Sequence, residues 1–152
     1  MTSPRELVAV ECARRGQDAF VRDCARLVAG DYSDVALIAA LAPRSSAKYS
    51  DGAIHFDVYW FRVWGMRGLL WAYAAEGTAA AVPAVLAGLR DEHWRVREMA
   101  AKVAARHRVD DALDDLAELR GDAVPRVRAA AERALVALTT GQSATARRRP
   151  ST

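Results

Sequence analysis

The chain has little of what a metal centre or a disulfide framework requires. Its 152 residues include only two cysteines, Cys12 and Cys24, and three histidines. No histidine or further cysteine stands at metal-ligand spacing around these two, so we expect no metal site and predict no cofactor. Both cysteines fall at apolar positions of expected helices, where a free thiol behaves as a small buried hydrophobe. The alternative, a disulfide between them, is disfavoured by a reducing compartment.

Long apolar runs are missing as well. No uninterrupted apolar stretch reaches the roughly 20 residues that a helix needs to cross a bilayer. The first seven residues lack the apolar core of a signal peptide and include the acidic Glu6. We therefore expect a cytoplasmic protein without membrane contact. Residues typical of strands are scarce outside one segment, whereas Ala, Leu, Arg and Glu are abundant, and this composition predicts an all-α fold.

Excess positive charge is absent from most of the chain. The net charge is +3, yet residues 1–77 contain as many acidic as basic side chains, and so do residues 78–140. The excess comes from Arg147, Arg148 and Arg149, so the pI of about 9.2 gives little support for a nucleic-acid-binding domain. Residues 141–152 are polar and cannot bury much surface, which predicts a flexible basic tail behind a single domain of residues 1–140.

One pattern occurs twice, in residues 91–138. Asp91 is followed by Arg95-Val-Arg97, and Asp122 is followed 31 residues later by Arg126-Val-Arg128 at the same spacing. A period of this length holds two short helices and two turns, and it is typical of a helical solenoid. We expect helices over residues 78–90, 91–108, 110–120 and 122–138, with 78–90 and 110–120 as the first helices of their repeats.

The N-terminal part predicts three less regular helices within residues 3–42. Ser3, Pro4 and Glu6 form a capping-box sequence, and Gly16 is a plausible stop. Asp18 is expected to cap the second helix, whose apolar positions are Phe20, Val21, Cys24, Leu27 and Val28. The third helix is expected to begin at Ser33 or Asp34 and to bury Val35, Ile38 and Leu41. Residues 43–55 lack periodicity and predict a surface loop.

The segment from Phe56 to Tyr73 holds seven of the eleven aromatic residues. Shifted by 33 residues, Phe61-Arg-Val-Trp64 aligns with Trp94-Arg-Val-Arg97, so residues 56–73 look like a degenerate second helix of the repeat. Asp57 is its expected cap. Trp60, Trp64, Arg67 and Trp71 are spaced to share one face, and a second apolar face lies elsewhere on the helix. Such a helix either lies centrally in the domain or binds a partner.

Residues 80–91, followed by Arg95-Val-Arg97, resemble the HEAT repeat, and so do residues 112–122, followed by Arg126-Val-Arg128. In that family an Asp in the turn between the helices precedes a Val-Arg pair. The resemblance is strong over residues 78–138 and partial over 33–77, and it implies an α-α superhelix with its repeats over residues 56–138. HEAT proteins are mostly interaction scaffolds, although HEAT-like alkylpurine DNA glycosylases and phycobilin lyases are enzymes.

These observations predict a small protein-interaction scaffold that contacts an unknown protein through its second helices. The candidate contact residues are Trp60, Trp64, Arg67, Trp71, Trp94, Arg95, Arg97 and Arg128. For Arg97 and Arg128 the favoured role is a structural ladder with the turn aspartates, and the alternative is anion binding in a groove. The aromatic residues have the alternative of simply filling the core, and the charge that separates between the helix layers can reflect ordinary solvated surfaces.

A second class of function stays open. The aromatic helix is compatible with a nucleic-acid- or nucleotide-directed protein, a reduced relative of the HEAT-like glycosylases, or with an enzyme that has a small-molecule pocket. No grouping of Ser, Cys and His suggests a nucleophile with its base. His55 and Asp57 are the only acid/base candidates, and an enzyme predicts that they reach into a concave pocket beside the tryptophans.

Overall fold

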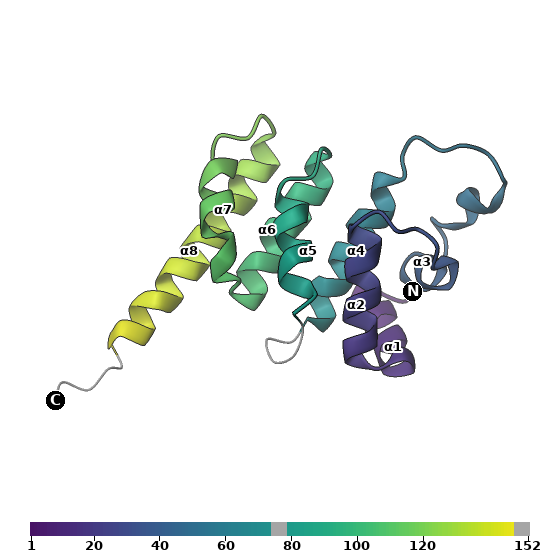
Figure 1. Cartoon of the computed structure of the whole chain (residues 1–152), viewed down its shortest axis with the longest axis horizontal. Helices are drawn as coiled ribbons and strands as arrows, with labels where there is room; N and C mark the ends of the chain where they lie inside the picture. Colours follow the sequence, from purple (N-terminus) through teal and green to yellow (C-terminus); the bar gives the residue numbers. More distant parts are fainter. Residues whose placement is uncertain (74–78, 148–152) are drawn as a thin grey trace.

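The computed structural model describes residues 1–73 and 79–147, with side chains up to residue 140. The described part folds into eight α-helices and two short 3-10 helices (Figure 1). The α-helices are α1 (Pro4–Arg15), α2 (Gln17–Val28), α3 (Val35–Leu41), α4 (Tyr59–Ala72), α5 (Ala81–Leu89), α6 (Trp94–His107), α7 (Leu113–Leu119) and α8 (Pro125–Arg147); the 3-10 helices are η1 (Ala47–Ser50) and η2 (Asp110–Ala112). The expected all-α solenoid is therefore confirmed.

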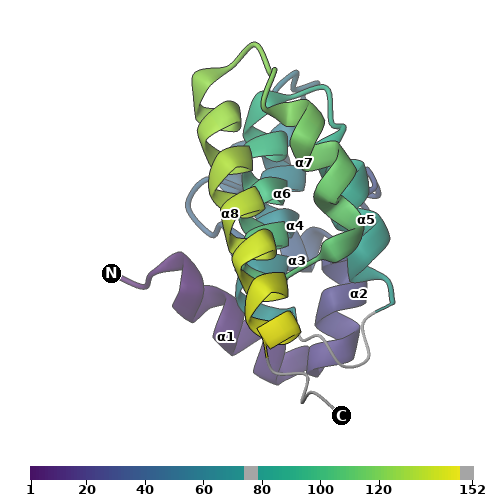
Figure 2. The same cartoon turned by 90° about the vertical axis from the view of Figure 1, so that its left-hand side faces the viewer.

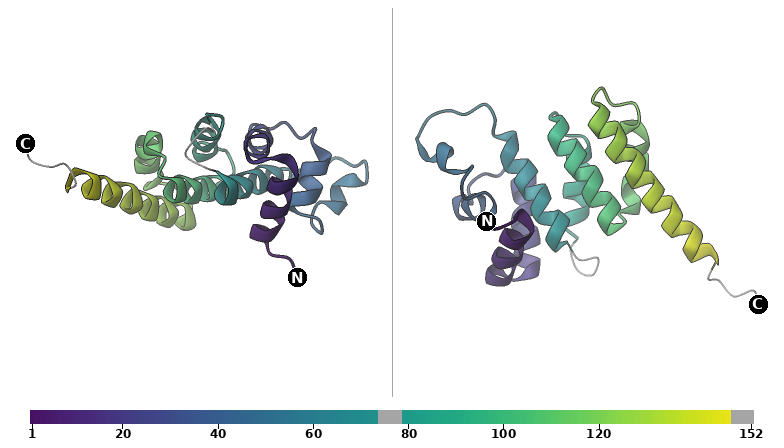
Figure 3. Two further views of the ribbon diagram at one scale, coloured as in Figure 1. Left: turned by 90° about the horizontal axis from the view of Figure 1, so that it is seen from below. Right: turned by 180° about the vertical axis from the view of Figure 1, so that it is seen from behind.

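The helices form two layers. Seen from below, α2, α5 and α7 lie in one layer, and α4, α6 and α8 lie in the other (Figure 3). Contacts run along each layer, most extensively between α6 and α8 and between α4 and α6, and across the layers from α2 to α4, from α5 to α6 and from α7 to α8. Figure 2 looks along the stack, with α7 and α8 nearest the viewer. Each repeat thus buries its apolar face on a neighbour.

The repeat that contains α4 has α2 as its first helix. In the structure α3, η1 and the connecting segments are inserted between the two paired helices, and α1 packs beside them on α3 and α4. The close pairing depends on Gly68: a Cβ there would lie 2.5 Å from Sγ of Cys24 and 3.3 Å from Cζ of Phe20. The backbones of α2 and α4 can approach only because that position has no side chain.

Local sequence signals decide where most N-terminal elements begin. Ser3 and Glu6 form the expected reciprocal capping box, and Gly16, with φ of 88°, ends α1. The carboxylate of Asp34 accepts from the backbone N–H of Leu37 and so caps α3. The predicted cap at Asp18 is wrong, because α2 already begins at Gln17 and Gly16 is its N-cap residue.

The core follows the helical periodicity of the sequence with few exceptions. All five apolar positions predicted for the second helix are buried: Phe20, Val21, Cys24, Leu27 and Val28. In α3 the prediction for Val35 is wrong, because this residue is 66% exposed and Leu37 is buried in its place. Cys12 and Cys24 are both free thiols, and burial raises the pKa of each. Cys24 therefore acts as a packing residue, as expected.

A ladder of ion pairs joins successive repeats. Arg97 in α6 donates from Nε and Nη2 to the carboxylate of Asp122, at 2.8 and 3.2 Å, and its Nη1 donates to the backbone carbonyls of Asp91 and Glu92. Arg62 in α4 holds Asp91 in the same bidentate way. These contacts match the structural role predicted for Arg97. The side chains of Arg97 and Asp122 are largely shielded from water, which strengthens their ion pair.

The C-terminal helix is longer than the repeat pattern predicts. α8 continues to Arg147 and extends beyond α7 (Figure 1), so residues 141–147 are helical where the composition predicts a flexible tail. Ala144 and Ala146 favour helix, Gly141 lies within the helix without ending it, and no proline occurs between Pro125 and Pro150. Arg148 and Arg149 of the predicted basic tail, and the expected helix start at Thr78, lie outside the described residues.

Over the described residues no helix has both the length and the apolar character that a bilayer-spanning segment requires.

Candidate binding site on the second helices

α4 is the helix that positions the candidate site. It packs on α2 from the other layer and on α6 within its own, and its expected cap is wrong: Asp57 binds Lys48 instead, and no side chain caps the helix. Of the predicted contact residues on this helix, Trp64 is buried at 4% exposure, whereas Trp60, Arg67 and Trp71 are partly buried. The tryptophans therefore both fill the core and reach the surface.

The partly buried tryptophans are covered by arginines from neighbouring helices. Arg95 of α6 lies over the rings of both Trp60 and Trp94, with its guanidinium carbon 5.0 and 4.5 Å from the ring centroids. Arg126 lies 5.5 Å from Trp94. Arg5 and Arg106 lie on Trp71, at 5.3 and 4.7 Å. We call this array of Trp60, Trp71, Trp94, Arg95, Arg106 and Arg126 the arginine–tryptophan surface. Cation–π contacts of this kind hold the guanidinium groups in place while leaving their donors available.

Polar contacts fix the two ends of α6 against α4. At the N-terminal end Nδ1 of His93 accepts from the backbone N–H of Arg95, and the ring stacks on Tyr59 at 3.5 Å between centroids. At the other end Nε2 of His107 donates to the carbonyl oxygens of Leu69 and Leu70 at the end of α4, 3.0 Å from each. Burial lowers the pKa of both histidines, which favours their neutral forms.

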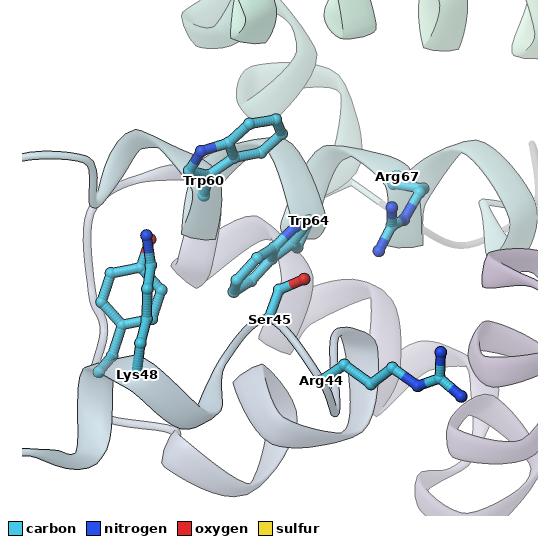
Figure 4. A pocket seen from close by; sticks show the side chains of 7 residues that line it. Arg44, Ser45, Lys48, Trp60, Trp64 and Arg67 are labelled. Atoms are coloured by element: carbon cyan, nitrogen blue, oxygen red, sulfur yellow. The ribbon is translucent and has the colours of Figure 1, made fainter.

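A pocket of about 500 Å³ opens between α4 and the segment before it. Figure 4 shows Trp60, Trp64 and Arg67 on the helix, with Arg44, Ser45 and Lys48 on the segment opposite. Tyr49 completes the lining. A neighbouring pocket of about 380 Å³ shares Arg44, Ser45, Trp64 and Arg67 with it and continues toward α1. Both pockets are open to solvent and combine cationic with aromatic walls.

Arg67 is the most unusual residue of the pocket. Its Nη2 donates to the backbone carbonyl of Leu41 at 3.0 Å, whereas its Nε is buried without a hydrogen-bond partner. No carboxylate of the described residues pairs with it, and burial lowers the pKa of its guanidinium. A guanidinium remains charged in proteins, so its desolvation is offset here by one carbonyl and not by an opposite charge.

The two acid/base candidates lie beside the pocket and not in its lining. Nε2 of His55 is 2.8 Å from a carboxylate oxygen of Asp51, and the ring meets Tyr49 edge-on. Asp57 pairs with Lys48 at 2.5 Å, and this ammonium lowers the pKa of the carboxyl group. The walls of the pocket thus carry cations, hydroxyl groups and aromatic rings, which suit binding of an anion.

Arg97 and Arg128 lie away from this pocket. Nη1 of Arg128 donates to the backbone carbonyl of Asp122 at 2.7 Å, and Arg97 is engaged by the ladder. Sequence reasoning missed Arg44, Ser45, Lys48 and Tyr49, which the insertion brings opposite the tryptophans. It also missed Arg62 as a ladder residue and Arg106 as the partner of Trp71. The sequence signal for the pocket residues was the presence of the basic residues Arg44 and Lys48 shortly before the aromatic segment.

Within the described part of the chain, no three side chains of His, Cys, Asp or Glu gather closely enough to form a metal-binding cluster.

Comparison with known proteins agrees with the stacked geometry. Residues 67–136, from the second half of α4 into α8, match a family model of HEAT repeats. These residues are HEAT repeats. Their turn aspartates, Asp91 and Asp122, accept the ladder contacts of Arg62 and Arg97. The arginine–tryptophan surface spans the matched residues and the part of α4 before them. Comparisons with curated proteins and with solved structures found no match.

Proposed function

We propose that this HEAT-repeat protein is an interaction scaffold that binds an acidic protein segment on the arginine–tryptophan surface. The observation that carries the proposal is the arrangement of Arg95, which lies between Trp60 and Trp94 and has no carboxylate partner among the described residues. Aromatic residues and arginines are the residue types that dominate binding hot spots. A guanidinium already held on an aromatic ring loses little entropy when it binds a carboxylate.

Charge complementarity argues for an acidic partner. On the opposite layer α7 exposes Asp114 and Glu118, and Asp111 lies exposed just before it. On the arginine–tryptophan surface, Glu98 is buried and already shared between Lys102 and Arg126, at 3.4 and 3.1 Å. Arg95 and Arg106 keep their charge unpaired within the described residues. The exposed face of α7 is therefore acidic, whereas the arginine–tryptophan surface on the other layer is basic, even though the whole domain is nearly neutral.

A single strand of nucleic acid is the second candidate, because stacked tryptophans and arginines also suit bases and phosphates. The ionic-strength dependence separates the two. Nucleic-acid binding releases condensed counterions, so its affinity falls steeply and log-linearly with salt. Titration with a labelled oligo-dT strand at several salt concentrations tests this candidate directly, and the absence of binding at low salt contradicts it.

Selection from a random peptide library tests the proposed scaffold. We expect enrichment of peptides that combine Asp or Glu with a large apolar residue, because the surface offers both kinds of contact. Arg95→Gln should lose this enrichment, and Arg22→Gln is the matched control because Arg22 is exposed on α2 in the other layer. Enrichment of neutral or basic peptides, or identical selection by Arg95→Gln and the unmodified protein, contradicts the proposal.

A further inference from the structure

The pocket between α4 and residues 44–49 has more positive charge than its surroundings neutralise. Arg44, Lys48 and Arg67 line it, and no carboxylate does. Lys48 pairs with Asp57, whereas Arg44 and Arg67 make no ion pair with any described residue. The Nε of Arg67 is buried and has no acceptor, so no described group offsets the desolvation at that end of the guanidinium. A partly desolvated cation without a counter-charge favours the binding of an anion beside it.

The number and placement of the donors favour a phosphate group. Arg67 approaches from the helix, and Arg44 and the hydroxyl-bearing Ser45 from the facing segment, with Lys48 at the end near Trp60 (Figure 4). Donors on two opposite walls can serve the several terminal oxygens of a phosphate monoester, which carries nearly two negative charges at neutral pH. A carboxylate has only two oxygens and would leave part of this set unused.

The remaining walls are aromatic. The rings of Trp60 and Trp64 are stacked at an angle of 25° with 6.5 Å between centroids, and Tyr49 meets Trp64 edge-on at 6.2 Å. A volume of about 500 Å³ lies within the range of small-ligand sites, which is roughly 300–1,000 Å³. Flat rings bind beside indole faces through stacking that tolerates different ring chemistries.

From these features we propose that the pocket binds a small organic phosphate that carries a flat ring, with the phosphate on Arg67 and Arg44 and the ring against Trp60 and Trp64. The cations of this pocket are not those of the arginine–tryptophan surface. Ligand binding in the pocket is therefore a proposal independent of the proposed scaffold function. Only Trp60 belongs to both.

Titration of the full chain with AMP and with phenyl phosphate, followed by tryptophan fluorescence and calorimetry, tests the pocket. Both probes should saturate one site. Adenosine, which lacks the phosphate, and inorganic phosphate, which lacks the ring, should each bind at least about tenfold more weakly, because each forfeits one half of the contacts. If neither ring-bearing phosphate saturates, the proposal is wrong. If inorganic phosphate binds as tightly as AMP, the proposed contact between the ligand ring and the tryptophans does not exist, and the proposal is wrong in that part.

Variants assign the binding to the pocket. Arg67→Met should weaken AMP binding by about tenfold or more, as expected for the loss of a charged donor. Arg44→Gln should also weaken it, and since Arg44 is exposed this change leaves the core intact. Arg22→Gln and Arg106→Gln, outside the pocket, should leave the affinity unchanged. Equal weakening by Arg22→Gln and Arg44→Gln would show attraction to the overall charge and overturn the pocket. If Arg106→Gln no longer selects acidic peptides but still binds AMP, the peptide surface and the phosphate pocket are separate sites.

Discussion

Arg62 in α4 and Asp91 in the turn before α6 form a bidentate ion pair, with 2.7 Å from Nε to Oδ2 and 3.0 Å from Nη2 to Oδ1. Arg97 and Asp122 repeat this geometry between α6 and the turn before α8. When the repeats of this chain are aligned with a shift of 33 residues, Arg62 corresponds to Arg95 and not to Arg97. The degenerate repeat thus keeps the ion pair between successive repeats, but its arginine stands two positions earlier in the helix. The position that Arg97 occupies in the next repeat is therefore available for Trp64, which lines the pocket.

The ladder predicts that Arg97 contributes much more to stability than Arg128, which has no ion pair within the described residues. Arg97→Met should lower the free energy of unfolding by about 3 kcal/mol, because it leaves the shielded carboxylate of Asp122 without its partner and two carbonyls without a donor. Arg128→Met removes only one bond to a carbonyl, and about 1 kcal/mol is expected. Urea denaturation measures both. Equal losses in the two variants would contradict the ladder.

The partly buried His93 and His107 predict that stability depends on pH above the range where carboxylates titrate. Burial lowers the pKa of His107 from its ordinary value of 6.5, so the unfolded chain takes up a proton more readily than the folded one. This contribution to stability is complete above the ordinary pKa and is lost as the pH falls through it toward the lower folded pKa. His93 acts in the same direction.

Replacing His107 isolates its share of that pH dependence. In His107→Gln the side-chain amide can still donate to a carbonyl, but it does not titrate. We expect a smaller slope of the unfolding free energy between about pH 7.5 and pH 5, the range around the histidine pKa. Urea denaturation at a series of pH values checks this, and an unchanged slope would mean that His107 contributes nothing.

The close approach of α2 and α4 predicts that Gly68→Ala destabilises the domain. The added Cβ would lie 2.5 Å from Sγ of Cys24, and such overpacking costs about 1–3 kcal/mol, more than the gain of up to about 1 kcal/mol in helix propensity. Gly121→Ala is the control, because its nearest contact is 3.5 Å away. Thermal melting compares them, and the double variant Gly68→Ala/Cys24→Ala should recover part of the loss. A melting temperature that rises in Gly68→Ala would refute the packing account.

Helical periodicity and turn residues predicted much of this fold correctly. The buried stripe of α2 follows directly from the 3.6-residue period, and the ladder residues Arg97 and Asp122 follow from their recurrence at fixed spacing. The pairing of α2 with α4 was not predictable in this way, because it depends on tertiary shape complementarity at Gly68. Arg62 was missed for a related reason. Its pairing with Asp91 depends on the position of the guanidinium group in space, and the repeat pattern places no arginine of the ladder at that position.

The candidate site was predictable only on the side that α4 supplies. The spacing of Trp60, Trp64 and Arg67 correctly placed them together, since one helix presents them all. Their opposite wall comes from residues 44–49, which have no periodic pattern and whose position depends on how α3 and η1 pack. The degree of burial of Trp71 likewise depends on Arg5 and Arg106, which are distant in sequence.

The insertion of residues 29–58 between α2 and α4 also predicts an order in which the repeats assemble. α5 pairs with α6, and α7 with α8, across short turns, so little loop-closure entropy opposes them. The first repeat must close a much longer loop, and it gains most from a preformed α6 as a template. We expect the pocket, which is built from this insertion and α4, to form last during folding and to open first in local unfolding. A ligand that holds both walls together would therefore protect the end of the solenoid that we expect to open first.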